Sequence, residues 1–316
     1  MMDDNFFTVI TAIKWGRNIQ DNVRKFVQFQ MTVNISCVFF VITTCLILGH
    51  SPFNVVQLLW INLIMDVLAA IAFSTENPPA QIRRDRVSSK DRIITKPMMR
   101  SILFQSLYQI LVMLLLLYVG PQAGGYEYNL YTTELRQDGN PTYRLMHQTF
   151  MFQCFVMMNI FNMINCRVLD PIPMAPSVSI EEMSVEDHRI LEEATKPSFN
   201  IFANPFRNFW FWIIVFGELN IQYLMVGYAS IGIFFTTTPL TFSQHLTAVC
   251  LGLGSWAVAA ILKLTGPKLI NAMPQFSEDK EALDAAKNVS DRAQSLKFKK
   301  TTPQPVSERL HSEEDE

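Results

Sequence analysis

The stretch Trp60-Ile61-Asn62-Leu63-Ile64-Met65-Asp66 decides the fold class, because it places an amide and a carboxylate inside an otherwise apolar run. On an α-helix Asn62 and Asp66, four residues apart, share one face about one turn apart. A carboxylate near the middle of a bilayer costs at least ~2.5 kcal/mol, so it usually faces a protein interior or an ion path. Carboxylate and amide oxygens are the ligands that hard divalent cations favour. The stretch therefore predicts an ion-translocating membrane bundle.

Long apolar segments surround this stretch. Hydrophobic residues make up 49% of the 316 and charged residues 17%, which is typical of a polytopic membrane protein. Six segments approach the ~20 residues that a spanning helix needs. They are roughly Phe26–Leu48, Phe53–Phe73, Met98–Gly120, Leu145–Cys166, Asn208–Tyr228 and Thr241–Leu264. The predicted fold is an all-α membrane protein whose six transmembrane helices form three hairpins, with the fifth helix extended if the apolar Ile231–Phe235 belongs to it.

The basic residues predict the orientation of these spans. Those on one side are Lys14, Arg17, Arg24, Lys25, Arg83, Arg84, Arg86, Lys90, Arg92 and Lys96, before the first span and between the second and third. The loops on the other side are almost free of Lys and Arg, with only Arg136 between residues 121 and 143. By the positive-inside rule, both termini are expected in the cytosol.

The first two spans are joined by only Gly49-His50-Ser51-Pro52, so they must lie antiparallel and in contact. Asn34 lies 16 residues before His50, and Asp66 lies 14 residues after Pro52. At ~1.5 Å per residue both are roughly 21–24 Å from the turn. Asn34, Asn62 and Asp66 can therefore converge at one depth, and we predict that they form a metal-ion site. The alternative is a set of interhelical hydrogen bonds that holds the bundle together.

Six motifs along the chain form a recognisable set. They are Trp15-Gly-Arg-Asn-Ile19, Lys25-Phe-Val-Gln-Phe-Gln-Met-Thr-Val-Asn34, Gln57-Leu-Leu-Trp-Ile-Asn-Leu-Ile-Met-Asp66, Thr75-Glu-Asn-Pro-Pro79, Phe155-Val-Met-Met-Asn-Ile-Phe-Asn162 and Asn200-Ile-Phe-Ala-Asn-Pro-Phe-Arg-Asn208. Together they resemble the P-type calcium ATPases, in particular the plasma-membrane type, which calmodulin regulates in several branches. The resemblance implies that the six spans are the fifth to tenth membrane helices of such a pump.

The resemblance also implies a domain division and a ligand set. Residues 1–25 would be the end of the phosphorylation domain and the cytosolic stalk, 26–264 the membrane domain, and 265–316 a cytosolic polar tail. Asn34, Asn62 and Asp66 match the family's ligand positions on the fifth and sixth helices. Where the reticulum branch has further oxygen ligands, this chain has Cys37, Met65 and Asn159. A thiol and a thioether are poor calcium ligands, so a single calcium site is implied, with Asn159 as a packing amide.

Motifs for ATP hydrolysis do not occur in these 316 residues. The family's Asp-Lys-Thr-Gly-Thr phosphorylation motif, its Thr-Gly-Glu-Ser loop and the Pro-Glu-Gly-Leu of its fourth helix are all missing. ATP and Mg²⁺ would therefore act only through domains outside this sequence. One carboxylate and two amides alone should bind calcium weakly, because affinity rises with the charge of the ligands.

Two functions remain open from the sequence. The first is the membrane translocation domain of an ATP-driven transporter that exports Ca²⁺ from the cytosol, most plausibly at the plasma membrane, with the vacuole or another endomembrane as the alternative. The second is a standalone, non-catalytic relative with a regulatory or assembly role. Expected partners are calcium, the lipid bilayer and the missing pump domains, and no nucleic acid. Calmodulin could bind the basic segment 280–300, but its acidic residues favour a solvated helix.

Overall fold

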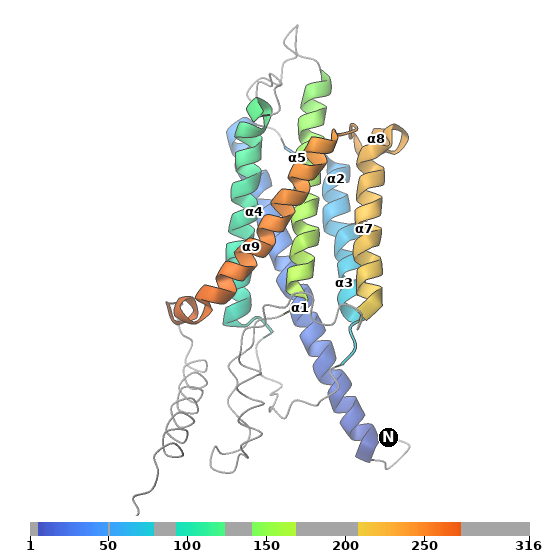
Figure 1. Cartoon of the computed structure of the whole chain (residues 1–316), viewed down its shortest axis with the longest axis vertical. Coiled ribbons are helices and arrows are strands. Elements are labelled where there is room, and N and C mark those ends of the chain that lie inside the picture. The colour runs from blue at the N-terminus through green and yellow to red at the C-terminus, as the bar shows by residue number, and fades with distance from the viewer. Residues whose placement is uncertain (1–5, 50, 79–92, 124–140, 169–207, 273–316) are drawn as a thin grey trace, which may run out of the picture. The chain divides into compact units, whose positions relative to one another are not determined.

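The computed structural model describes residues 6–49, 51–78, 93–123, 141–168 and 208–272. The described part is helical, with short connections between the helices (Figure 1). In chain order the elements are α1 (Phe6–Leu48), α2 (Val55–Leu59), η1 (Trp60–Met65), α3 (Asp66–Ser74), α4 (Lys96–Ala123), α5 (Pro141–Cys166), α7 (Phe209–Gly227), α8 (Ala229–Phe235) and α9 (Phe242–Ala272). The basic loop at 83–92, the acidic loop after 168 and the candidate calmodulin segment lie outside the described residues.

Six helical segments within the described residues are long and apolar enough to cross a membrane, which confirms the predicted fold class. Their bounds are Thr8–Ile47, Val55–Ser74, Lys96–Gly120, Leu145–Cys166, Phe209–Gly227 and Phe242–Leu264. The second span is built from α2, η1 and α3 in succession. It begins where the side chain of Gln57 accepts a 3.2 Å hydrogen bond from the backbone N–H of Asn54, which satisfies a donor that the first helical turn leaves free.

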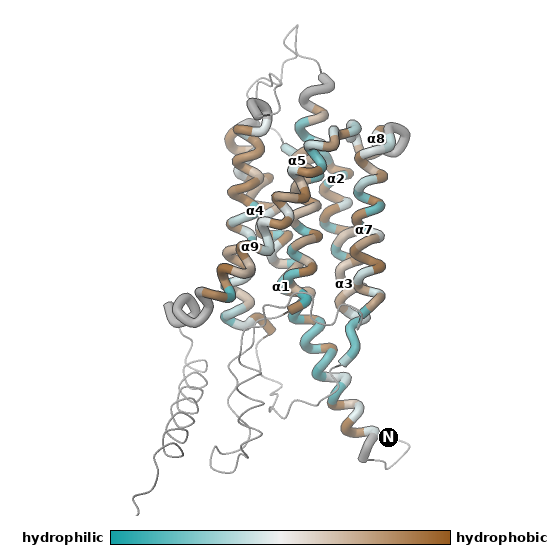
Figure 2. Tube along the Cα trace, viewed as in Figure 1, coloured by the Kyte–Doolittle hydropathy of each residue, from teal (hydrophilic) through white to brown (hydrophobic). Residues whose placement is uncertain are grey.

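Two boundaries differ from those the sequence predicts. The helix of the first predicted span begins at Phe6, well before Phe26, and polar turns lie between its start and the apolar segment (Figure 2). A helix that continues out of the apolar segment keeps its backbone hydrogen-bonded, so polar residues can extend it beyond the membrane. The fifth span ends at Gly227, because Tyr228 takes an extended conformation. The apolar segment up to Phe235 therefore forms a separate helix, α8, instead of lengthening the span.

The helix α5 lies at the centre of the bundle (Figure 1). In its most apolar 18-residue window 89% of residues are buried, against 39% or less in the other five spans. Its mean hydropathy is also the lowest of the six. A helix surrounded by protein need not be apolar on every face, and α5 buries the amides of Gln153, Asn159 and Asn162. The other spans expose large apolar side chains, as expected of helices that face lipid.

Aromatic side chains hold α3 between α1 and α7. The ring of Phe73 on α3 lies 6.3 Å from that of Phe29 on α1 and 5.9 Å from that of Phe211 on α7, measured between centroids. Below this layer, Thr75 and the N-cap residue Asn208 form a hydrogen bond of 3.3–3.4 Å. These contacts fix the relative depth of α3 and α7, which matters for the site described next.

Candidate ion site

The conformation of residues 60–66 differs from the continuous α-helix that the sequence predicts. Trp60–Met65 forms a π-helix, and the α-helix resumes at Asp66. A π-helix has an i→i+5 hydrogen-bond pattern and occurs mostly as a short insertion, frequently at functional sites. Asp66 is 7% exposed, whereas Asn62 is exposed. The two residues therefore stand in different surroundings, although they are four positions apart.

Asp66 has one described hydrogen-bond partner. The side-chain amide of Gln30 on α1 donates a 2.5 Å hydrogen bond to Oδ2 of Asp66, and Oδ1 has no hydrogen-bond partner among the described residues. Asn34, which is half-buried, lies four residues after Gln30 and thus on the same face of α1. Because Gln30 contacts Asp66, the predicted ligand Asn34 lies one helical turn along α1 from the residue that binds the predicted ligand Asp66. Gln30 was not predicted from the sequence, although it lies four residues before Asn34 and therefore on the same face of a helix.

Cys37 and Met65, which the resemblance predicts to stand where two-ion pumps have oxygen ligands, lie in the apolar core. They are 3% and 1% exposed and belong to the same cluster of buried hydrophobic residues. Their positions fit packing.

Asn159 takes part in a hydrogen-bond network that joins three helices. Ser36 on α1 donates a 2.6 Å hydrogen bond to the side-chain oxygen of Gln109 on α4. The amide of Gln109 in turn donates a 3.0 Å hydrogen bond to the side-chain oxygen of Asn159 on α5. All three residues are fully buried. This network is the kind of interhelical polar contact that holds membrane bundles together, which fits the packing role expected for Asn159.

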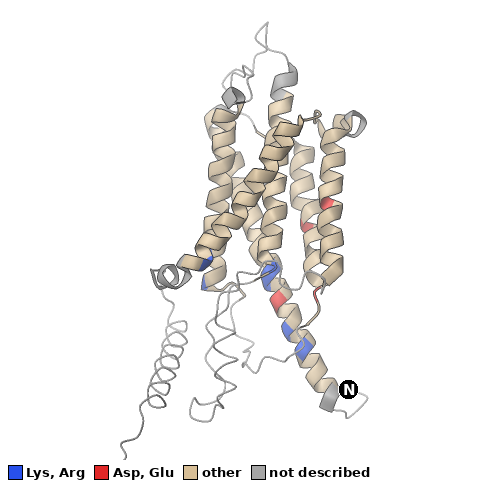
Figure 3. Ribbon diagram, in the orientation of Figure 1, with Lys and Arg blue, Asp and Glu red and all other residues tan. Residues whose placement is uncertain are grey.

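A second buried acid lies close to Asp66. Glu218 on α7 is 1% exposed, and neither of its carboxylate oxygens has a hydrogen-bond partner among the described residues. The helix α7, which carries Glu218, packs against α3, which begins at Asp66. Figure 3 shows one acidic segment on α3 and one on the adjacent α7. Sequence reasoning missed Glu218, although the cost of a carboxylate within an apolar span applied to it as well as to Asp66.

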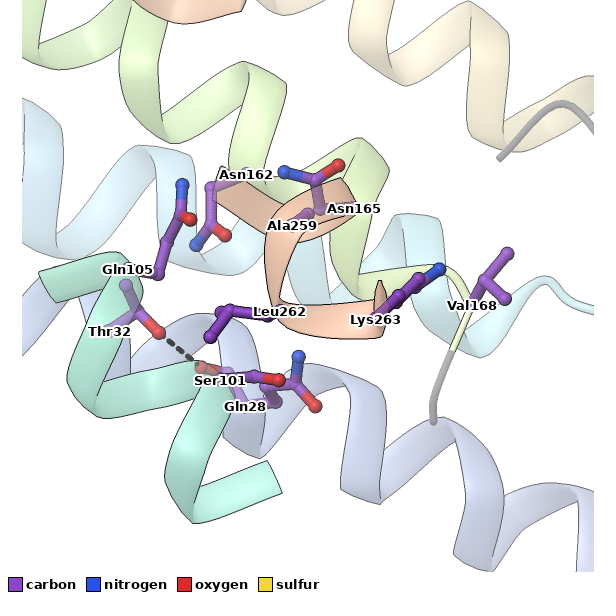
Figure 4. Close-up of a pocket in the computed structure, with 10 residues that line it drawn as sticks. All are labelled: Gln28, Thr32, Ser101, Gln105, Asn162, Asn165, Val168, Ala259, Leu262 and Lys263. Carbon is purple, nitrogen blue, oxygen red and sulfur yellow. Dashed lines mark hydrogen bonds between the residues drawn. The ribbon is translucent and has the colours of Figure 1, made fainter. Parts of the chain in front are cut away.

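A small polar pocket lies apart from these acids, between α1, α4, α5 and α9 (Figure 4). It is lined by Gln28, Thr32, Ser101, Gln105, Asn162, Asn165, Val168, Ala259, Leu262 and Lys263. None of the predicted ligands Asn34, Asn62 and Asp66 lines it.

No group of three or more His, Cys, Asp or Glu side chains that could hold a metal occurs in the part of the chain that the structure describes.

Comparison with known proteins places the chain in a family. Residues 50–265 match the family described as cation transporting ATPase, C-terminus. The chain belongs to this family. Among similar proteins, calcium-transporting ATPase 2, plasma membrane-type, of Arabidopsis thaliana is 31% identical over 264 residues. Calcium-transporting ATPase 1, plasma membrane-type, of Oryza sativa subsp. japonica is 34% identical over 264 residues.

The alignments cover 83% of this chain but only 21–22% of those relatives, so the chain spans about a fifth of their length. Together with the six spans, they identify an integral, multi-pass C-terminal membrane region of the plasma-membrane calcium ATPase type.

Proposed function

We propose that this C-terminal region is the translocation domain of an ATP-driven pump that exports Ca²⁺ from the cytosol. The observation that carries the proposal is Asp66, a buried carboxylate at the end of a π-helix with one oxygen unpartnered among the described residues. The names of the relatives supply calcium as the transported ion. ATP and Mg²⁺ would act through pump domains outside this sequence.

In this proposal Asp66, Asn34 and Asn62 coordinate the ion. Asn34 is half-buried and Asn62 is exposed, so both lie toward the outside of the described bundle rather than its centre. A further membrane helix that packed on this side would cover them, and in the family the fourth helix supplies a glutamate ligand. The ion would then be bound at Asp66, with that helix covering Asn34 and Asn62.

The proposed mechanism needs a mechanical link between the cytosolic domains and the ion site. Residues 1–25 are the proposed end of the phosphorylation domain and stalk, followed by the membrane domain at 26–264 and a cytosolic tail at 265–316. Lys25 of α1 forms an ion pair with Glu76, just after α3, and Asn18 donates a 2.7 Å hydrogen bond to the backbone oxygen of Glu76. A movement of the stalk would thus pull on the end of the helix that begins with Asp66. Both termini would be cytosolic, and the plasma membrane is the proposed location.

The proposal is tested by transport. The complete protein that contains this sequence would be expressed, and ATP-dependent uptake of ⁴⁵Ca²⁺ would be measured in inside-out membrane vesicles. Uptake that depends on ATP supports the proposal. If the complete coding sequence lacks the phosphorylation motif and no uptake occurs, the chain is a non-catalytic relative, and co-purification with a calcium pump would then test a regulatory role.

A further inference from the structure

We propose that Asp66 and Glu218 together form a two-carboxylate site for a calcium ion between α3 and α7. The inference deepens the proposed function, on which it rests for the identity of the cation. The ligands predicted from the sequence, Asn34, Asn62 and Asp66, include no residue of α7.

Glu218 needs a counter-charge if it is to be ionised at its position in α7. It is almost completely buried in the middle of an apolar helix, and no described residue donates a hydrogen bond to either oxygen. A charged group in such a place is strongly disfavoured unless it is paired or coordinates a metal. Asp66, on the adjacent helix α3, is also acidic and so supplies no counter-charge to Glu218.

The two carboxylates lie at the same depth. Thr75 and Asn208 are hydrogen-bonded to each other and mark a common level for α3 and α7. Asp66 lies nine residues before Thr75, and Glu218 lies ten residues after Asn208. At ~1.5 Å per residue the distances from that level are roughly 13.5 and 15 Å. The helices α3 and α7 pack against each other between these points, as Figure 3 shows.

Amide oxygens extend the set of ligands. Gln30 uses its amide nitrogen on Asp66, and its own side-chain oxygen is buried without a hydrogen-bond partner. Gln222, one turn after Glu218 on α7, donates a 2.9 Å hydrogen bond to Gln153, and its side-chain oxygen is likewise buried and unpartnered among the described residues. In each glutamine the side-chain nitrogen donates a hydrogen bond, and the side-chain oxygen remains available as a ligand.

Together these side chains match the chemistry of calcium. Calcium takes six to eight oxygen ligands in flexible geometry, and its affinity rises with the charge of the ligands. A divalent ion between Asp66 and Glu218 would neutralise both carboxylates and satisfy oxygens that otherwise have no donor. Glu218 would supply the second negative charge that the set Asn34, Asn62 and Asp66 lacks.

Calcium binding to the 316-residue chain in lipid nanodiscs tests the inference. The wild type should bind ⁴⁵Ca²⁺, and Glu218→Gln, which removes the charge but keeps the shape, should raise the Kd at least tenfold. Glu218→Asp, which keeps the charge, should restore part of the affinity. Asn220→Ala is the matched control, because Asn220 lies on the same helix, is exposed and bonds only the backbone of its own helix. Its Kd should equal that of the wild type.

The possible results separate this inference from the proposed function. If Glu218→Gln binds calcium as the wild type does while Asp66→Asn does not, Glu218 is no ligand, and the inference is overturned while the Asp66 site stands. If the wild-type chain binds no calcium, the two-carboxylate site is also overturned, whereas a pump site completed by another helix is not. If Asp66→Asn binds normally, the proposed ligand set and this inference both fail. Thermal unfolding of each variant would show that a loss of binding is not a loss of fold.

Discussion

The side-chain amide of Gln30 on α1 donates a 2.5 Å hydrogen bond to Asp66 on α3, and this bond ties the first span to the acid of the second. It fixes the direction of one carboxylate oxygen and leaves the other, Oδ1, unpartnered among the described residues. A carboxylate held through one oxygen is preorganised to offer the other to a cation.

Removal of this bond should weaken ion binding without abolishing it. A hydrogen bond to a charged group contributes ~1.5–3 kcal/mol, so Gln30→Ala should raise the Kd for calcium by about tenfold or more. The measurement is the calcium dependence of ATP-driven uptake by the complete protein. Gln28→Ala is the control, because Gln28 lines the separate polar pocket and should leave the calcium dependence unchanged. Equal effects of the two variants would contradict the role of Gln30.

The ion pair between Lys25 and Glu76 should couple the stalk to α3. Both side chains are largely buried, at 13% and 17% exposure, and Arg167 also lies 3.8 Å from the carboxylate of Glu76. Loss of one partner of a fully buried pair costs about 3–5 kcal/mol, and partial exposure reduces this, so Glu76→Gln should destabilise the bundle by ~1–3 kcal/mol. It should also lower the rate of transport more than the affinity for calcium.

The control for Glu76→Gln is Asp21→Asn, which weakens the more exposed pair of Asp21 with Arg24. This pair is long, at 3.9 Å, and Asp21 is 36% exposed, so the effect on thermal unfolding in detergent should be smaller than that of Glu76→Gln. A Glu76→Gln protein with the unfolding temperature and transport rate of the wild type would contradict the coupling.

The sequence predicted the spans better than it predicted the site. A run of some twenty apolar residues has few alternatives to a spanning helix, so the six spans follow from length and composition. The π-helix at Trp60–Met65 could not be predicted, because one extra residue per turn leaves no distinct pattern in a six-residue, mostly apolar stretch. The Gln30 contact depends on how α1 and α3 pack. Glu218 could have been singled out from the sequence, because the cost of a carboxylate within an apolar span applies to it as it does to Asp66.

Asn159 should matter for stability and not for ion binding. Asn159→Ala would leave the buried side-chain amide of Gln109 without its acceptor, and an unsatisfied buried donor costs ~1–3 kcal/mol. The expected result is a lower unfolding temperature with an unchanged Kd for calcium. Cys37→Ala should likewise leave the Kd unchanged, because a thiol is a poor calcium ligand. A complete loss of calcium binding in either variant would show that the ligand set is wrongly assigned.

The packing of α9 should depend on its glycines. A side-chain carbon at Gly254 would collide with the ring of Tyr108 on α4, whose hydroxyl donates a 2.7 Å hydrogen bond to the backbone of Leu251. Overpacking of this kind costs ~1–3 kcal/mol, so Gly254→Ala should lower the unfolding temperature. Gly217→Ala on α7 is the control, since nothing lies within 4 Å of the added carbon. If both variants unfold at one temperature, α9 does not pack as described.

The most direct test of the central claim is ATP-dependent ⁴⁵Ca²⁺ uptake by the complete protein that carries Asp66→Asn. The substitution preserves the size of the side chain and removes the charge on which ion binding is proposed to depend. We expect uptake to be abolished while the protein remains in the membrane at the level of the wild type. Uptake close to that of the wild type would contradict the assignment of Asp66 as the central ligand.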